Sequence, residues 1–149
     1  MTDGNKLRVV VDTNLLISAA ISSNSLADKF IAAWQKDTFS LIISHEQLEE
    51  IRDVSKRKKF ASYPKFLERI EELIQTLAFT AEKAEVLLEK DLPLHSRDPE
   101  DNFLLSAALG GSADYLITAD EDLLVLQDHP ALGKLKIMTV RDFLERSKI

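Results

Sequence analysis

The sequence predicts an α/β protein built around a short, mostly parallel sheet. Two observations support this prediction: short apolar runs alternate along the chain with segments of helical periodicity, and acidic residues directly follow several of these runs. A strand that is buried on both faces, as in a parallel sheet, is a continuous apolar run. Because crossovers between parallel strands are right-handed, we expect an α/β sandwich with helices on both faces of the sheet.

Four apolar runs fit such strands. The first is Leu7–Val11 (LRVVV), which contains three valines, and the second is Phe39–Ile43 (FSLII). The other two are Tyr115–Thr118 (YLIT) and Lys136–Met138 (KIM). Each is short and flanked by polar residues, as buried strands are.

The expected helices begin at residues that favour helix N-termini, and one of them ends at Gly110–Gly111. The segment 80–94 is ambiguous, because its first part fits a helix and a short extended stretch could follow. The expected helix starts are Ser25, Ser44 with Gln47 as a capping box, Pro64, Asp98 with Pro99, and Thr139.

The composition fits one domain spanning residues 1–149. Hydrophobic residues make up 45% of the chain, which is enough for a sizeable core, and charged residues make up 30%. Cysteine is absent, which excludes disulfides, thiolate zinc sites and cysteine nucleophiles. We recognise no secretion signal and no membrane-spanning run, so we expect a cytoplasmic protein.

Acidic residues cluster at one edge of the expected sheet. In open parallel sheets, functional sites form outside the carboxyl ends of the strands. Asp12 follows the first strand, and Asp120 follows the third. Glu50 lies on the helix after the second strand, with Glu46 as a second candidate on the same helix edge. Asp101 lies at the start of the helix that crosses over to the third strand.

These acids predict a metal site. The net charge of −6 argues against a general nucleic-acid binder, but the position of the carboxylates matters more than their sum. A single acid after a strand is more often a turn or cap residue than a ligand. Several at one edge repel and raise one another's pKa. Mg²⁺ or Mn²⁺, as one or two ions, suits such carboxylates.

Four segments resemble the successive motifs of PIN-domain proteins, in particular the branch of toxin components of toxin–antitoxin systems. The motifs occur in family order and span nearly the whole chain. The resemblance implies a three-layer α/β/α sandwich and the cleavage of single-stranded RNA with Mg²⁺ or Mn²⁺. The segments are VVVDTN at Val9–Asn14, SHEQLEEI at Ser44–Ile51, RDPEDNFLLSAAL at Arg97–Leu109 and DYLITADEDLL at Asp114–Leu124.

The resemblance also implies roles for individual residues. Asn14 and Thr118 match positions that support the site through hydrogen bonds. The role of Asp98 is open: it is a metal ligand, a group that supports the ligands, or only the helix cap. An antitoxin protein would be the partner, and a homodimer is conceivable. The catalytic acids would be Asp12, Glu50, Asp101 and Asp120, of which Asp12, Asp101 and Asp120 hold the metal.

A basic run could grip the substrate. Lys56, Arg57, Lys58 and Lys59 follow the helix that carries Glu50, so they could contact RNA phosphates. The alternative is a solvated helix end, because cations also favour helix C-termini.

Two other functions remain open at this point. One is a binding module with this fold but little or no catalysis, which would act through its partner. The other is an aspartate-based phosphatase or receiver domain, which also places an Asp after the first strand. Against the phosphatase, the sequence has Asn14 where a second Asp is needed and no lysine at the end of the third strand.

Overall fold

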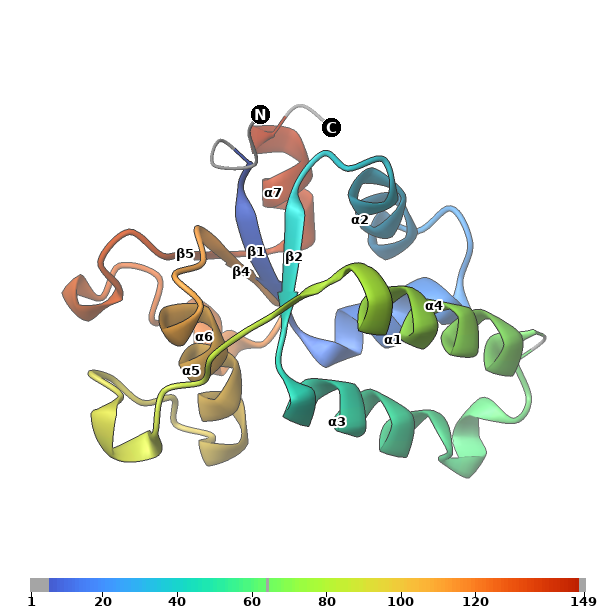
Figure 1. The fold of residues 1–149 in the computed structure, drawn as a ribbon, viewed down its shortest axis with the longest axis horizontal. Helices are drawn as coiled ribbons and strands as arrows, with labels where there is room; N and C mark the ends of the chain where they lie inside the picture. The colour runs from blue at the N-terminus through green and yellow to red at the C-terminus, as the bar shows by residue number, and fades with distance from the viewer. Residues whose placement is uncertain (1–5, 64, 148–149) are drawn as a thin grey trace.

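A five-stranded parallel sheet forms the centre of the protein, in the order β3-β2-β1-β4-β5 (Figure 1). The computed structural model describes residues 6–63 and 65–147. All described strand pairs are parallel, so the carboxyl ends of the strands meet at one edge, as the sequence predicts. The strands are β1 (Arg8–Val11), β2 (Ser40–Ile43), β3 (Glu82–Lys83), β4 (Tyr115–Ile117) and β5 (Lys136–Met138).

Helices cover both faces of the sheet and complete a three-layer α/β/α sandwich (Figure 1). Along β1, Val9 and Val11 belong to one hydrophobic core and Val10 to the other, because neighbouring side chains of a strand point to opposite faces. The first core is covered by α1 (Thr13–Ile21), α2 (Leu26–Gln35), α3 (His45–Ser55), α4 (Phe66–Thr80) and α7 (Val140–Arg146), and the second by α5 (Asn102–Gly110) and α6 (Glu121–Leu124).

The first core holds a cluster of aromatic rings. Phe30 and Phe39 lie 4.9 Å apart between ring centroids, and Phe143 lies 5.3 Å from Phe39 and 5.4 Å from Tyr115. Each such pair contributes about 0.5–1.5 kcal/mol beyond the burial of its area. The cluster therefore fixes α2 and α7 against β4 and against the residue that precedes β2.

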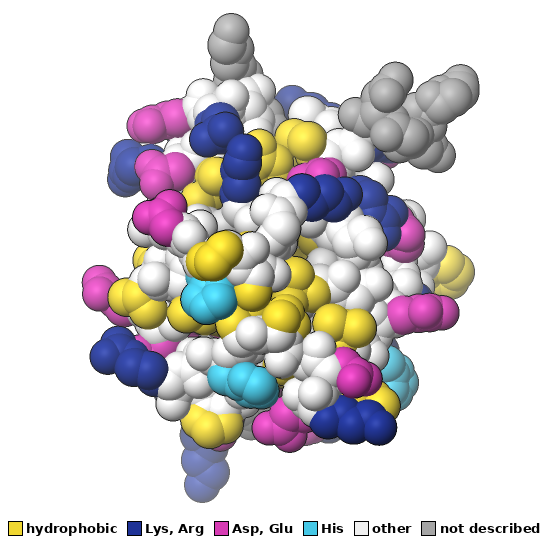
Figure 2. All heavy atoms as spheres, turned by 90° about the vertical axis from the view of Figure 1, so that its left-hand side faces the viewer, with side chains coloured by type: hydrophobic (Ala, Val, Ile, Leu, Met, Phe, Trp, Pro, Cys, Tyr) yellow, Lys and Arg dark blue, Asp and Glu magenta, His cyan; other side chains and the backbone are white. Residues whose placement is uncertain are grey.

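The second core lies under a thinner layer. Figure 2 shows the face of the molecule on the side of α5 and α6, where apolar side chains gather at the centre and charged side chains lie around the rim. Val86, Leu88 and Val125 are large apolar residues that are more than a third exposed. None of the helices in the described part of the chain is long and apolar enough to cross a bilayer.

Most predicted elements are confirmed. The four predicted strands match the observed ones to within one residue at either end. The side chain of each predicted cap except Pro64 accepts a backbone N–H within the first turn. Pro64 lies outside the described residues. After Asp98 the chain forms the short 3-10 helix η4 (Pro99–Asp101) before α5.

The prediction of a helix in the first part of segment 80–94 is wrong. The edge strand β3 extends the sheet beside β2, and a short 3-10 helix, η3 (Glu89–Asp91), follows. The intervening backbone packs along α5, where Leu87 donates its N–H to the Ser106 carbonyl at 3.3 Å. A Cβ at Gly110 would lie 2.0 Å from the Glu85 carbonyl oxygen, so this approach requires glycine. Packing against a distant helix thus determines a segment that local pattern leaves ambiguous.

The capping box at α3 is only half formed. Ser44 accepts the N–H of Gln47 at 3.1 Å, as predicted. The Gln47 side chain does not return to the cap; its amide donates to the Val11 carbonyl at 2.5 Å and to the Thr13 hydroxyl at 3.3 Å. Gln47 is 1% exposed. It therefore ties the start of α3 to the end of β1.

We expect Gln47→Ala to lower the free energy of unfolding by about 1–3 kcal/mol, because it removes a buried donor from the Val11 carbonyl. Urea unfolding followed by circular dichroism measures this change. Gln75→Ala is the matched control on the exposed side of α4 and should change stability by less than about 0.5 kcal/mol. Equal stability of the two variants would contradict a structural role for Gln47.

Candidate active site

Asp12 and Asp120 follow the neighbouring strands β1 and β4, and one hydroxyl links them. Thr118, which is fully buried, donates its hydroxyl to Asp12 Oδ2 at 2.8 Å and accepts the N–H of Asp120 at 3.0 Å. Asp12 Oδ1 accepts the N–H of Asn14 at 3.1 Å. Because Val11 pairs with Ile117, Asp12 leaves the sheet level with Thr118, two residues before Asp120.

Asp98 and Asp101 approach the same edge from the turn before α5. Ser96 lies beneath them with 7% of its surface exposed. Its hydroxyl lies 3.4 Å from Asp101 Oδ2 and accepts the N–H of Asp98 at 3.2 Å. Its own N–H donates to the side chain of the buried Asn102 at 2.8 Å. Ser96 and Asn102 thus position two acids that are predicted site residues, although sequence reasoning did not single them out.

Asp101 is the electrostatic centre of this group. Its pKa is raised from 3.8 to about 7, first by burial and then by a hydrogen bond with Asp120. The negative charges of Asp120, Asp98 and Asp12 raise this pKa further. The structure therefore brings Asp12, Asp98, Asp101 and Asp120 close enough together for their charges to act on one carboxyl.

Asp122 extends the group outward. One carboxylate oxygen from each of Asp98, Asp101 and Asp122 lies within 4.8 Å of the others, a spacing that could hold a metal ion. The N–H of Asp122 donates to Asp120 Oδ1 at 2.9 Å, so the backbone of α6 joins this outer acid to the inner one. Arg97 donates to the carboxylate of Asp122. In the sequence, Arg97 belongs to the RDPEDN motif and Asp122 to the ADEDLL motif, and only this position points to the two residues.

Glu50 is not brought into this group by any hydrogen bond or ion pair within residues 6–63 and 65–147. It is half-buried on α3, one turn after Gln47, which faces β1 and α1. Glu46 is exposed and lines a separate pocket of about 370 Å³ together with Pro99 and Asn102. The catalytic role of Glu50 stays a prediction.

A pocket of about 420 Å³ opens beside the inner acids. Asp12, Asn14 and Asp120 form its polar part. Asn14, predicted to support the site, is exposed here and contributes its backbone N–H to Asp12. The remaining lining residues are Leu15, Ser18, Ala27, Ala119 and Val140.

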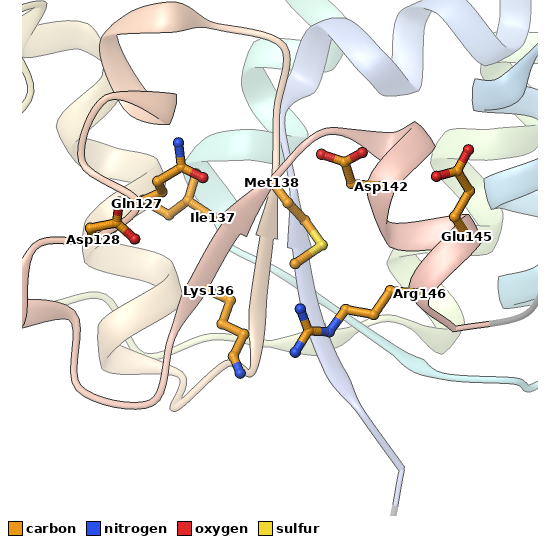
Figure 3. Close-up of a pocket in the computed structure, with 8 residues that line it drawn as sticks. All are labelled: Gln127, Asp128, Lys136, Ile137, Met138, Asp142, Glu145 and Arg146. Carbon is orange, nitrogen blue, oxygen red and sulfur yellow. The ribbon is translucent and has the colours of Figure 1, made fainter.

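A larger pocket of about 690 Å³ lies at the free edge of β5, and none of the predicted site residues lines it (Figure 3). Lys136 and Arg146 point to the same side, below Met138. Lys136 begins β5, so this basic end lies toward the amino ends of the strands, away from the acids.

The basic run at the end of α3 is fully on the surface. Lys56, Arg57, Lys58 and Lys59 are all exposed, whereas Phe60 is buried and stacks on Phe66 at 4.8 Å. In Figure 1, α3 extends from the sheet along the lower side of the molecule, so the run lies at the far end of this helix.

A sequence profile of the PIN domain matches residues 8–122, the segment that contains every acid described above. The chain belongs to the PIN-domain family. PIN domains are generally nucleases that act on RNA and use divalent metals.

Two individual proteins are similar to this PIN-domain protein. An uncharacterized protein of Methanocaldococcus jannaschii, MJ1680, is 29% identical over 146 residues, covering 94% of this chain and 91% of that protein. The crystal structure of PAE2754 from Pyrobaculum aerophilum matches with a TM-score of 0.63 and 15% identity, covering 95% of this chain and 90% of the other. The structural match shows the fold.

We expect the metal-free protein to become less stable as pH rises from about 4 to about 8. The folded state favours protonated Asp101, so its stabilising effect is complete below the unfolded pKa of 3.8 and is lost as pH rises through about 7. After allowance for solvent screening of this partly exposed group, the change is about 1–2 kcal/mol. Chemical denaturation with a chelator present measures it.

Asp101→Asn should flatten this dependence and raise stability at pH 8. Asp53→Asn, which removes an exposed acid from α3, should leave the difference between the two pH values unchanged. An unaltered pH dependence in Asp101→Asn would show that another group is responsible.

Proposed function

We propose that the protein is a Mg²⁺- or Mn²⁺-dependent endoribonuclease that cleaves single-stranded RNA. The observation that carries the proposal is the convergence of Asp12, Asp101 and Asp120, which come from three separate segments, on one sheet edge. In a PIN-domain protein, such a cluster of carboxylates can support phosphodiester hydrolysis.

The donor set fits a hard divalent cation. Carboxylates and water are the ligands that Mg²⁺ and Mn²⁺ prefer. The pKa of Asp101 is raised by burial first and then by the neighbouring carboxylates of Asp120, Asp98 and Asp12, and a bound ion would favour the ionised form. Asp12, Asp101 and Asp120 would hold the ion directly or through water.

The bound ion would lower the pKa of a water molecule and balance charge on the phosphate. The protein's own groups fix the geometry around it. Thr118 and the N–H of Asn14 leave Asp12 little rotational freedom, and Ser96 restrains Asp101. We propose that Glu50, or failing it Glu46, orients the attacking water.

The substrate would extend from the acids along α3. This helix has 11 residues, so at ~1.5 Å per residue it spans about 16 Å. Lys56–Lys59 lie just beyond its end and are exposed. They would therefore contact phosphates several nucleotides from the scissile bond, without taking part in the chemistry.

We further propose that the protein is the cytoplasmic toxin of a toxin–antitoxin pair. Its partner would be an antitoxin protein, and the toxin could assemble as a homodimer. The resemblance of the four sequence motifs to that branch supports this assignment. The acidic edge also gives an antitoxin a target, because an arginine or lysine of the partner could pair with Asp12 or Asp120.

Two alternatives make different predictions. A binding module would bind the metal and the partner but cleave no RNA. A receiver domain has the strand order 2-1-3-4-5, whereas this sheet has the order β3-β2-β1-β4-β5. An aspartate phosphatase would form a phosphoenzyme at Asp12 with a small phosphodonor, and the proposed nuclease would not.

We expect Asp12→Asn and Asp120→Asn each to lower the Mn²⁺-dependent cleavage rate of single-stranded RNA by at least about 100-fold, because each removes a metal-holding carboxylate. Both variants should also be more stable than the wild type without metal, because repulsion is relieved. Asp128→Asn removes the same charge from the distant pocket at β5 and should cleave normally.

A wild-type protein that binds Mn²⁺ but leaves a panel of RNAs intact would instead favour the binding module. Normal cleavage by Asp12→Asn or Asp120→Asn would remove that residue from the site.

Replacing Lys58 and Lys59 with Ala should weaken RNA binding and flatten its salt dependence, by about 0.7 in the log–log slope for each phosphate that is no longer neutralised. Binding to a labelled oligonucleotide at several salt concentrations measures both effects. The control pair Lys134→Ala and Lys136→Ala removes the same charge near β5 and should keep the slope. An unchanged slope in the first variant would leave the run as a solvated helix end.

A further inference from the structure

Arg97 lies at the outer side of the acidic group and is paired with one of its members. Its Nε and Nη2 both donate to Asp122 Oδ1, at 3.0 and 2.6 Å. The side chain of Arg97 is 75% exposed, and that of Asp122 is 32% exposed. The pair is therefore an ion pair on the solvent-exposed side of the acidic group.

Both ends of this bridge are anchored. Arg97 follows the buried Ser96, whose N–H is held by Asn102. Asp122 donates its N–H to Asp120, and its carbonyl lies 3.4 Å from the Ser96 hydroxyl. The guanidinium is thus placed beside Asp122 by the backbone on both sides, although an exposed ion pair alone adds at most about 1 kcal/mol of stability.

The carboxylate that Arg97 occupies is the one that would complete an outer cation site. Asp98, Asp101 and Asp122 each place an oxygen within 4.8 Å of the others. The guanidinium of Arg97 occupies one of the two carboxylate oxygens of Asp122 and adds one positive charge beside this set of three carboxylates. A divalent ion bound by the same three carboxylates would be repelled by the positive charge of Arg97.

We propose that Arg97 is a positioning residue that takes the place of a second metal ion and confines the metal to the inner acids. This inference rests on the proposed function, because it requires that Asp12, Asp101 and Asp120 hold an ion. Arg97 serves as the cation of the outer half of the group, and Asp122 is its partner and not a metal ligand.

Isothermal titration of the full chain with Mn²⁺ tests the proposal. The wild type should bind one ion per chain. Arg97→Gln frees Asp122 and should bind two, and Arg97→Met, which also removes the charge, should behave in the same way. Arg97→Lys keeps a cation beside Asp122 and should restore a single ion. Circular dichroism establishes that each variant is folded.

Two controls separate the site from a general charge effect. Arg146→Gln removes the same charge from the pocket at β5 and should keep one ion (Figure 3). In the double variant Arg97→Gln with Asp122→Asn, removal of the third carboxylate should return the count to one. Two ions in this double variant would exclude Asp122 as the ligand that Arg97 withholds.

The inference and the proposed function fail in different ways. One ion in the wild type and one in the folded Arg97→Gln and Arg97→Met variants would overturn the role of Arg97 and leave the nuclease site intact. Two ions in the wild type would also overturn it. No ion in the wild type would remove the proposed function, and the role of Arg97 with it.

Discussion

Repulsion among carboxylates at one edge of a parallel sheet is the constraint on which the site depends. Parallel pairing requires every strand to end at the same edge, so acids placed after β1 and β4 must become neighbours. A third acid, Asp101, reaches them from the start of α5, and its pKa rises to about 7 as a result of burial and of their proximity. The fold thus gathers negative charge that would be stable only if a proton or a cation balances it.

Uncharged buried groups hold this charge in place. Thr118 joins the ends of β1 and β4, Ser96 supports the turn before α5, and Gln47 ties α3 to β1. The exposed fraction of each residue is at most 7%, and each side chain donates to an oxygen atom at the carboxyl edge of the sheet. Because hydrogen-bond donors without charge do not neutralise the carboxylates, they can fix the geometry while leaving the site ready for a metal.

The sequence predicts the parts of the fold that depend on local pattern. Apolar runs locate the strands, and caps such as Ser25 and Thr139 locate the helices, because both signals lie within a few neighbouring residues. Parallel topology then places Asp12 and Asp120 together without any knowledge of side-chain packing. The position of β3 was not predictable in this way, since it depends on pairing with β2 and on the close approach at Gly110.

The features that the sequence did not predict are polar contacts between residues far apart in the chain. Gln47 fits a capping box equally well, and only the fold shows that its amide reaches Val11, 36 positions away. The bridge between Arg97 and Asp122 spans 25 positions and has no periodicity. Glu50 illustrates the opposite case: its helix is predicted correctly from local pattern, and its catalytic role stays a prediction.

The choice between helix cap and metal ligand is not exclusive for these acids. Asp12, Asp98 and Asp120 each cap a helix with Oδ1, which accepts a backbone N–H two residues ahead. The cap fixes the rotamer, and the helix N-terminus favours the negative charge. The second oxygen of each carboxylate is then directed by the same hydrogen bond. Capping therefore holds the three carboxylates in fixed rotamers and reduces the cost of bringing them together.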